Sequence, residues 1–345
     1  MNPVSARLLN QQLASPQFKE AAEVVSWFGA MQAQEYRLMR WAVSMRTKRP
    51  SAKDFETAYN DGRIVRGHLF RTTWQLVSGE DWRWMLDLCR VNALRGLAGW
   101  MKSNGVSIPA AEQDNIQLIF SDFLSKNRIA LKSSFAAALA EKGIMMDDHR
   151  LSYHIRLAEY SGLLCSGDLF PLKHSYALAE QKLPKRSPIP RDEALSLLAR
   201  KYFRSHGPAT LEDFVWWSGL GIGECREAMD SIRSELIQGQ RDGLTFFRHQ
   251  DGRVRGVCSG LVTLLPSYDE YLIGYKSRHI ALHPDHSHRA HNNRGIFWPV
   301  ILLDGEVVGN WTPSAADGAL DFFNGRPPVP DEAIEKQLKA FRSFL

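Results

Sequence analysis

The sequence predicts a mainly α-helical chain with short β wings, an α+β fold made of several small modules. Two features of the 345 residues lead to this prediction. Helical segments followed by two short β-rich runs recur three times along the chain. A Pro-rich and basic stretch, LPKRSPIP at 183–190, marks a boundary before the third repeat. A chain of this length suits two or three small domains better than one large core.

The first module is expected over residues 1–100. Ser51, followed three residues later by an acid, has the pattern of a helix N-cap. Two β-rich runs, at 64–70 and 73–77, predict a hairpin, and a further helix follows it. Apolar residues at helical spacing predict helices at 4–12, 18–28, 34–45 and 51–59.

The second module is expected over residues 110–182 and the third over 188–260. HGPAT at 206–210 breaks one helix and caps the next. The helices of the second module are predicted at 116–126, 133–142 and 147–161, with a wing formed by 163–165 and 176–178. Those of the third module are predicted at 191–205, 211–218 and 223–236, with a strand at 244–248.

The C-terminal region, residues 261–345, changes to β-rich character. Three runs predict a small sheet, and Asp304-Gly305 is a strong hairpin turn between two of them. A terminal helix is predicted at 331–344.

Three-helix modules that end in a β-hairpin are the winged-helix design, in which the third helix enters the major groove of DNA. We therefore expect tandem winged-helix modules, three in number. The repeat is architectural, because the sequence has no residue-level identity at a fixed period.

The charge pattern favours a partner that is a polyanion. The chain has a net charge of +5 and a pI near 9.0. Residues 36–73 contain nine Lys or Arg against three acids, and residues 271–294 contain four against one, with five histidines. Two concentrated basic stretches favour a surface that follows DNA phosphates over charges that are merely solvated.

The sequence also indicates where the protein acts. Its longest apolar runs are far shorter than a membrane span, and the N-terminus lacks the apolar core of a signal peptide. We expect a cytoplasmic, nucleoid-associated protein with no membrane partner, and a monomer because no dimerisation heptads are evident. The cysteines are far apart, without a CxxC pair, and are expected to be reduced and mostly buried: Cys89, Cys165, Cys225 and Cys258.

Five strings together resemble one protein family. They are MQAQEYRLMRWAVSMR (31–46), RGHLFRTTWQLVS (66–78), HGPATLEDFVWWSGL (206–220), LLPSYDEYLIGYKSR (264–278) and VILLDGEVVGNWTP (300–313). In this order they look like the winged-helix DNA glycosylases typified by the azinomycin-resistance enzyme, over nearly the whole chain. The resemblance implies three winged-helix motifs around a concave DNA-binding face. It also implies a relationship to enzymes that unhook DNA crosslinks and excise bulky alkylpurines.

Members of that family carry a Gln–apolar–Gln or Gln–apolar–Asp catalytic motif, and Gln32-Ala33-Gln34 fits the first form. Taken alone, the triplet is equally well the polar start of the helix at 34–45. The resemblance makes Gln32 and Gln34 the catalytic candidates. We assign water positioning to Gln34 and contact with the lesion nucleotide or backbone to Gln32, with the reverse order left open.

The chemistry of glutamine restricts the substrate. A Gln amide neither gains nor loses a proton at pH 7, so it can orient water but cannot act as a general base. An N7-alkylated purine is cationic and leaves without protonation. The predicted function is therefore a monofunctional DNA N-glycosylase that removes N7- or N3-alkylated purines from duplex DNA and, by resemblance, unhooks interstrand crosslinks.

Neither a metal nor an organic cofactor is expected, and the motif contains no Lys to form a Schiff base. The alternative is a non-catalytic winged-helix DNA-binding protein, either a transcription regulator or a lesion sensor. A small-molecule enzyme is a distant third, because no phosphate-binding glycine loop or catalytic triad is evident.

Basic residues near the motifs are the candidates for DNA contacts. In RGHLFR (66–71), basic and apolar residues alternate as in a wing strand with one face on phosphates, and an ordinary hairpin with solvated arginines is the alternative. The DNA-binding candidates are Arg37, Arg40, Arg66, His68, Arg71, Lys276 and Arg278.

Other conspicuous residues receive structural interpretations. Trp74 and the pair Trp216-Trp217 are expected in the core. At Gln75 the resemblance leads us to expect His, so the chain departs from the family there. Asp269 and Glu270 are adjacent, so they point apart and do not form a glycosidase pair. The histidines at 279–291 are interpreted as a mobile, solvated basic loop, with a zinc site as the alternative.

Overall fold

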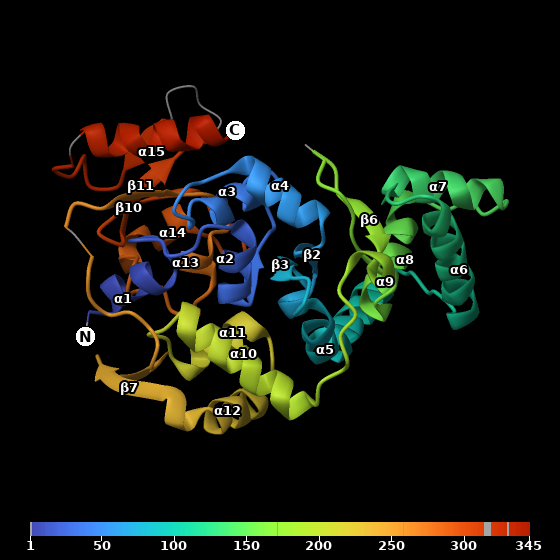
Figure 1. Cartoon of the computed structure of the whole chain (residues 1–345), viewed down its shortest axis with the longest axis horizontal. Helices are drawn as coiled ribbons and strands as arrows, with labels where there is room; N and C mark the ends of the chain where they lie inside the picture. Colours follow the sequence, from blue (N-terminus) through green and yellow to red (C-terminus); the bar gives the residue numbers. More distant parts are fainter. Residues whose placement is uncertain (1, 171, 258, 314–318, 330) are drawn as a thin grey trace. The chain divides into compact units, whose positions relative to one another are not determined.

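The computed structural model describes residues 2–170, 172–257, 259–313, 319–329 and 331–345 (Figure 1). They divide into two compact units, which are described separately. The larger unit comprises Met1–Phe55 and Leu195–Leu345, and the smaller unit comprises Glu56–Ala194. The larger unit thus contains parts of the first and third predicted modules together with the C-terminal region.

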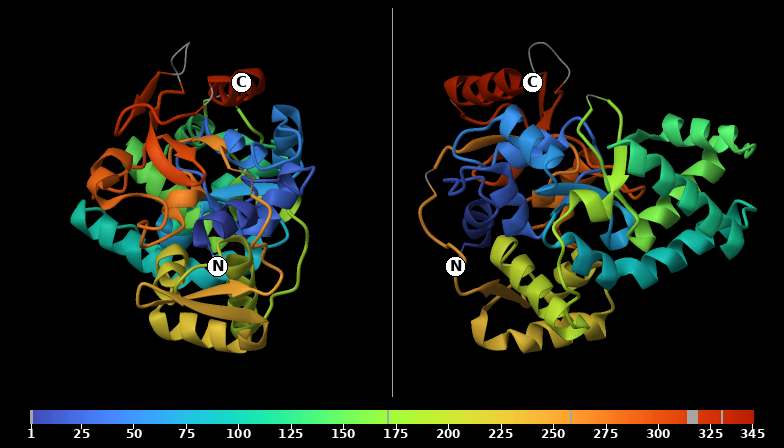
Figure 2. Two further views of the ribbon diagram at one scale, coloured as in Figure 1. Left: turned by 90° about the vertical axis from the view of Figure 1, so that its left-hand side faces the viewer. Right: turned by 45° about the vertical axis from the view of Figure 1, so that its right-hand side comes forward.

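The smaller unit contains the second predicted module. Its strands form a three-stranded antiparallel sheet of order β4-β6-β5, in which Leu164 of β5 pairs with Leu178 of β6. Helices α6 to α8 pack beside this sheet (Figures 1 and 2) around a core that contains Phe120 and Phe135. The elements are α6 (Ala110–Lys126), β4 (Ala130–Leu131), α7 (Lys132–Glu141), α8 (Asp148–Ser161), β5 (Leu164–Ser166), β6 (Ser175–Leu178) and α9 (Ala179–Lys182).

The helices and the two β runs predicted for residues 110–182 are present, with boundaries that follow local capping. Asp147 accepts the backbone N–H of Arg150 and begins α8, and Gly162 ends it in the left-handed conformation. Helix α6 begins at Ala110, six residues before its predicted start, directly after Pro109. The short strand β4 was not predicted, because two residues are too few for a periodic signal.

The predicted hairpin and the helix after it also belong to the smaller unit. Strands β2 (Ile64–His68) and β3 (Trp74–Ser78) pair antiparallel, and the turn η1 (Phe70–Thr72) joins them. Arg71 and Thr72 in this turn have φ values of 57° and 59°, which are unusual for residues with a Cβ atom. Helix α5 (Trp82–Ser103) follows.

The larger unit begins with α1 (Pro3–Asn10), α2 (Ala21–Phe28), β1 (Ala30–Gln32) and α3 (Met39–Ser44), and α4 (Ala52–Asn60) leads into the smaller unit. Helix α2 starts at Ala21 because Glu20 and Glu23 form a capping box. The predicted helix at 34–45 is wrong for its first five residues, which form a turn. The apolar pattern that suggested it begins only at Leu38, and the helix begins at Met39.

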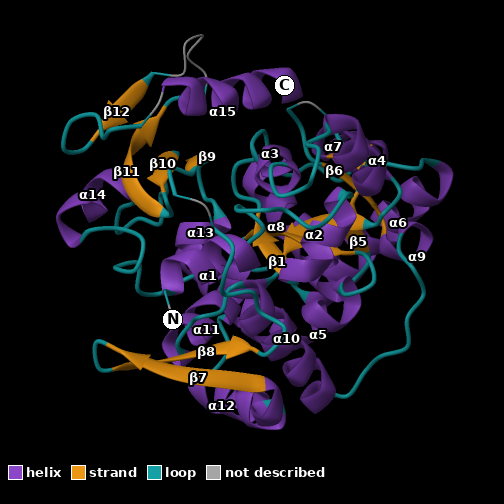
Figure 3. Cartoon of the chain, turned by 60° about the vertical axis from the view of Figure 1, so that its left-hand side comes forward, coloured by secondary structure: helices purple, strands orange, loops and turns teal. Residues whose placement is uncertain are grey.

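The helices of the third predicted module continue the larger unit. They are α10 (Arg191–Ser205), α11 (Leu211–Ser218) and α12 (Ile222–Ser231), followed by η2 (Arg233–Glu235), β7 (Leu236–Arg241) and β8 (Leu244–His249). The predicted helix at 223–236 is too long, since its last residues enter η2 and β7. The β7–β8 hairpin lies beside α12 (Figure 3), and Ala209 bridges to Phe247 of β8.

A four-stranded antiparallel sheet of order β12-β11-β10-β9 completes the larger unit. Its turn at Asp304-Gly305 has φ values of 52° and 88°, as predicted for this dipeptide. Helix α15 (Asp331–Phe344) packs on β9 and on Trp41. The strands are β9 (Val262–Leu265), β10 (Val300–Leu303), β11 (Glu306–Trp311) and β12 (Leu320–Phe322).

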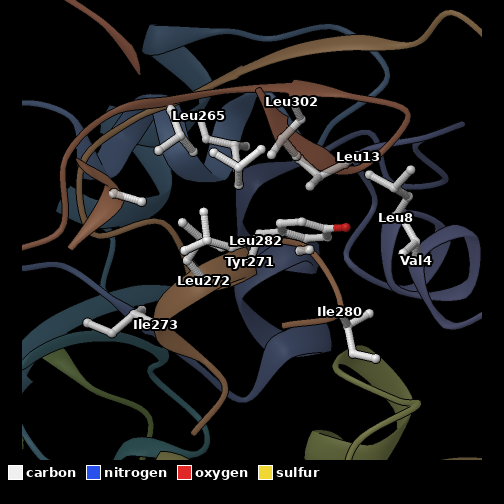
Figure 4. Close-up of a cluster of buried hydrophobic side chains, with 14 of the residues drawn as sticks. Val4, Leu8, Leu13, Leu265, Tyr271, Leu272, Ile273, Ile280, Leu282 and Leu302 are labelled. Carbon is white, nitrogen blue, oxygen red and sulfur yellow. The ribbon is translucent and has the colours of Figure 1, made fainter. Parts of the chain in front are cut away.

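A second cluster of the larger unit joins α1 to the sheet. Leu8 and Leu13 pack with Leu265, Tyr271 and Leu302 (Figure 4). The Tyr271 hydroxyl also donates to the Gly305 carbonyl at 2.9 Å. Segments separated by about 300 residues of sequence are therefore held in one core.

Two further predictions concern composition. No helix among the described residues combines the length and apolar character of a membrane span. Cys89, Cys165 and Cys225 are buried and free of disulfides, as expected, and Cys258 lies outside the described residues.

Candidate functional site

The Gln32-Ala33-Gln34 motif lies at the end of β1 in the larger unit. Helix α2 ends at Phe28, and Gly29 turns the chain into the strand with a φ of 81°. Gln32 is buried, with 6% of its surface exposed, whereas Gln34 is exposed. The two glutamines therefore have different environments, and only Gln34 reaches solvent freely.

The backbone at Gln32 is held by Glu270, the first residue of α13 (Glu270–Ile273). The Gln32 N–H donates to Glu270 Oε2 at 2.8 Å. Glu270 Oε1 accepts from Trp217 Nε1 at 2.7 Å and from His206 Nε2 at 3.1 Å. Sequence inspection assigned no supporting role to Glu270 or His206, although both lie in strings that it singled out.

The neighbouring carboxylate, Asp269, has different partners. Its Oδ1 and Oδ2 accept from Nη2 and Nη1 of Arg46 at 2.7 and 2.9 Å. Arg46 is fully buried, and its Nε donates to the Gln11 carbonyl. Asp269 and Glu270 thus have separate partners and point apart, as predicted for adjacent positions.

His206 is a buried, neutral group. Burial lowers its pKa, and this effect outweighs the nearby Glu270 carboxylate, which raises the pKa. Its Nδ1 lies 2.8 Å from Ser205 Oγ, so Ser205, His206 and Glu270 form a chain like a hydrolytic triad. Both Ser205 and His206 have no exposed surface, so this chain supports structure and does not provide a nucleophile.

The DNA-binding candidates of the larger unit lie on two segments. Arg37 is exposed and Arg40 half-buried in the segment after the motif. Lys276 is exposed, and its backbone N–H donates to Asp213 at 3.0 Å. The Arg278 guanidinium lies 4.9 Å from the ring centroid of Phe297.

The expectation that both tryptophans of α11 belong to the core is wrong for one of them. Trp217 is 1% exposed, but Trp216 is 40% exposed, and the Arg278 guanidinium lies 5.5 Å from its ring centroid. The indole Nε1 of Trp216 donates to the Ile273 carbonyl at 3.0 Å, which leaves part of the ring facing outward. Neighbouring helical positions differ by about 100° in direction, so one is buried and the next is not.

The candidates Arg66 and His68 lie in β2 of the smaller unit, and all five residues of that strand are buried. The Arg66 guanidinium lies 3.8 Å from the Trp74 ring centroid, and its Nη1 is 3.3 Å from His174 Nδ1. The argument that one face of this strand is open to phosphates is therefore wrong. Arg71, in the η1 turn, is half-buried.

His68 bridges two charged groups of α8. Its Nδ1 lies 2.8 Å from Glu159 Oε2, and its Nε2 lies 2.8 Å from Nη2 of Arg156. A guanidinium can only donate, so Nε2 accepts and the single proton is on Nδ1. Burial, more than any other effect, lowers the pKa of His68 and keeps it neutral.

Strand β3 places Trp74 opposite His68 and Gln75 opposite Gly67 of β2. Trp74 is half-buried, and its ring lies against His68, with 3.6 Å between the centroids. Gln75 is buried, its Nε2 donates to the Phe70 carbonyl at 3.3 Å, and its Oε1 has no hydrogen-bond partner among the described residues.

The histidine-rich stretch is more ordered than expected. It forms η3 (Pro284–His286) and α14 (Ser287–Ala290), and His291 stacks on Phe297 with 5.2 Å between centroids. Within the described ranges, no three His, Cys, Asp or Glu side chains are grouped as metal ligands.

Comparisons with known proteins identify the family of the chain. A model of the AlkZ-like DNA glycosylase family, described as "DNA glycosylase AlkZ-like", matches residues 25–344. The chain belongs to this family. The resemblance predicted from the five strings is confirmed, and the AlkZ-like chain is a DNA N-glycosylase, a hydrolase that acts on DNA.

Two relatives from Streptomyces sahachiroi match this AlkZ-like chain along most of its length. The interstrand DNA cross-link repair glycosylase is 22% identical over 350 residues, which cover 97% of this chain and 93% of that protein. The solved structure of DNA glycosylase AlkZ has a TM-score of 0.78 and 21% identity, and the match covers 99% of this chain and 95% of that one. The structural likeness shows that the fold is shared.

Proposed function

We propose that this DNA glycosylase hydrolyses the N-glycosidic bond of cationic N7- or N3-alkylated purines in duplex DNA. Gln34 holds the attacking water through its amide oxygen, and Gln32 contacts the lesion nucleotide or the backbone beside it. The observation that carries the proposal is the exposed, non-titrating Gln34 two residues after a backbone N–H fixed on Glu270. Like the S. sahachiroi relative named for cross-link repair, it also unhooks interstrand crosslinks.

The leaving group explains why a glutamine is sufficient for catalysis. An oriented water is a weak nucleophile unless the departing base is already activated. A cationic alkylpurine leaves as a neutral base, so the barrier is lowered before the protein contributes. Uracil and hypoxanthine are neutral and lack this advantage, although flipping them costs a similar amount.

Tandem winged-helix modules supply the DNA-binding framework in this proposal. In the sheet of order β4-β6-β5, β4 is the first of the three strands along the chain and it pairs with β6, which is the last. Ala209 makes the equivalent pairing with β8 in the larger unit. The first repeat has the same order of elements along the chain, from α2 through β1, α3, α4 and β2 to β3. Three such modules in one chain let a monomer bind DNA.

The DNA contacts are made by accessible basic residues. In the larger unit these are Arg37, Arg40, Lys276 and Arg278, and in the smaller unit Arg71 contributes from its turn. Phosphate contacts of this kind give affinity without base specificity, as a search for damage requires. The exposed ring of Trp216 beside Arg278 offers a stacking surface for a base.

Release of free base tests the proposal. The wild-type protein should release N7-methylguanine from duplex DNA and fail to release uracil or hypoxanthine at a comparable rate. Gln34→Ala should reduce the rate on the order of 10²-fold, whereas Gln34→Glu, which introduces a true base, should retain part of it. Gln181→Ala, at an exposed glutamine of α9, is the matched control. Equal release of uracil and N7-methylguanine, or a fully active Gln34→Ala protein, would contradict it.

A further inference from the structure

The Glu270 carboxylate is a hydrogen-bond centre inside the larger unit. Its side chain is 2% exposed, and it receives donors from three separate segments. Oε2 takes the backbone N–H of Gln32, and Oε1 takes the side-chain N–H groups of Trp217 and His206. The carboxylate thereby ties the end of β1 to α11 and to the residue that follows α10.

We propose that Glu270 is a positioning residue for the glycosylase reaction, because it fixes the backbone from which Gln34 is presented. This inference rests on the proposed function, since it takes Gln34 as the residue that holds water. Ala33, between the anchored Gln32 and the exposed Gln34, is 1% exposed and leaves little freedom between them. Small displacements of a catalytic group have large effects on rate.

His206 completes the anchor without moving a proton. A carboxylate accepts only, so the single proton of neutral His206 is on Nε2. Its Nδ1 lies 2.8 Å from Ser205 Oγ, which also lies 2.8 Å from the Lys201 carbonyl. Arg7 and Arg46, which also lie near His206, disfavour a second proton on the ring. The imidazole therefore acts as a fixed neutral donor to Glu270.

An amide at position 270 cannot satisfy these three donors. In one orientation of the Glu270→Gln side chain, the oxygen faces Trp217 and His206 while the NH2 group opposes the Gln32 N–H. In the other orientation the oxygen accepts from Gln32, but the NH2 group opposes the Trp217 Nε1–H, which can only donate. At least one buried donor is left unpaired in either case.

A second substitution removes that conflict. Trp217→Phe deletes the indole N–H, so the amide can direct its oxygen to Gln32 and its NH2 group to His206. The other neutral tautomer of His206 then accepts at Nε2 and donates from Nδ1 to Ser205 Oγ. The double variant restores an acceptor for the Gln32 N–H, although it loses a large side-chain contact.

The decisive experiment is single-turnover release of N7-methylguanine by the full chain, with DNA affinity and thermal unfolding measured in parallel. Glu270→Gln should lower the rate on the order of 10²-fold with little change in the Kd for DNA. Glu270→Gln/Trp217→Phe should recover about tenfold of that loss. Asp269→Asn is the matched control, since it alters an equally buried carboxylate that holds Arg46 and should affect unfolding more than rate.

The outcomes separate the two proposals. A wild-type protein that releases no alkylpurine contradicts the proposed function. An active wild type with a fully active Glu270→Gln variant overturns the positioning role, as does a double variant that is slower than the single one. If Glu270→Gln does not fold, Glu270→Asp keeps the carboxylate at shorter reach and should lower the rate at unchanged Kd, and a wild-type rate would overturn the inference.

Discussion

Two segments of this chain have the same kind of sequence, with arginines set among apolar residues, and the structure places them differently. In the segment at 31–46 of the larger unit, Gln34 and Arg37 are exposed. In β2 of the smaller unit, Arg66 and His68 are buried against Trp74 and the charged residues of α8. The comparison shows that interleaved charge does not reveal whether a segment faces solvent. The first segment also contains one buried arginine, Arg46, which pairs with Asp269.

The difference has an energetic meaning. A charged side chain in solvent contributes little to stability, whereas a buried one must keep its partners or leave them unpaired. Substitutions in the two segments should therefore separate into effects on DNA processing and effects on folding.

The largest effect is expected at the hairpin of the smaller unit. His68→Ala removes the group between Glu159 and Arg156 and leaves the buried Glu159 carboxylate without that donor. The free energy of unfolding should fall by about 3 kcal/mol, measured by chemical denaturation. His283→Ala, at an exposed histidine, should change it by less than about 0.5 kcal/mol. A small loss for His68→Ala would show that this cluster is not structural.

The second prediction concerns pH. Burial lowers the pKa values of His68 and His206, so the unfolded chain binds protons at a higher pH than the folded chain does. Stability should be complete above the ordinary value of 6.5 and decrease as the pH falls below it. Denaturation at about pH 7.5 and pH 5.5 should differ by about 1–2 kcal/mol, with the lower pH less stable.

An acidic group loses its contribution in the same direction but at lower pH, so it serves as an internal comparison. Hydrogen bonds from Arg200 lower the pKa of Glu235 to about 2. Its contribution is therefore complete above the ordinary value of 4.5 and is lost only as the pH falls towards 2. A protein that is more stable at about pH 5.5 than at about pH 7.5 would contradict the assignment of neutral histidines.

A smaller effect is expected from the exposed arginines of the larger unit. Arg37→Ala combined with Arg40→Ala should weaken DNA binding about tenfold at low salt, equally for all sequences, and reduce the salt slope by about 2. Unfolding should be almost unchanged. Arg66→Ala should show the reverse pattern, with lower stability and an unaltered salt slope. Equal salt slopes for both proteins would remove the distinction between the two segments.

The smallest effect is expected from removal of metal. Treatment with a chelator should leave base release unchanged, because the proposed reaction uses only protein side chains and water. Loss of activity that zinc restores would assign a metal to the histidine-rich stretch at 279–291 instead.

Much of the fold could be predicted because its signals are local. The helices of the second module, the β2–β3 hairpin and the Asp304-Gly305 turn depend on periodicity, caps and turn residues within a few positions. The turn after Gln34 and the start of β7 were missed. In both places a helix was predicted to extend beyond the residues that form it, because helical spacing of apolar residues does not mark where a helix begins or ends.

What the sequence by itself determined was the order of most helices and strands, the family and the Gln32-Ala33-Gln34 motif, since each is written in contiguous residues. Only the tertiary structure decided that Trp216 is exposed, that Arg66 is buried, and that Glu270 holds the motif. The physical reason is the range of the interactions. Glu270 meets its donors from positions 32, 206 and 217, and nothing in the sequence near any of them specifies the other two.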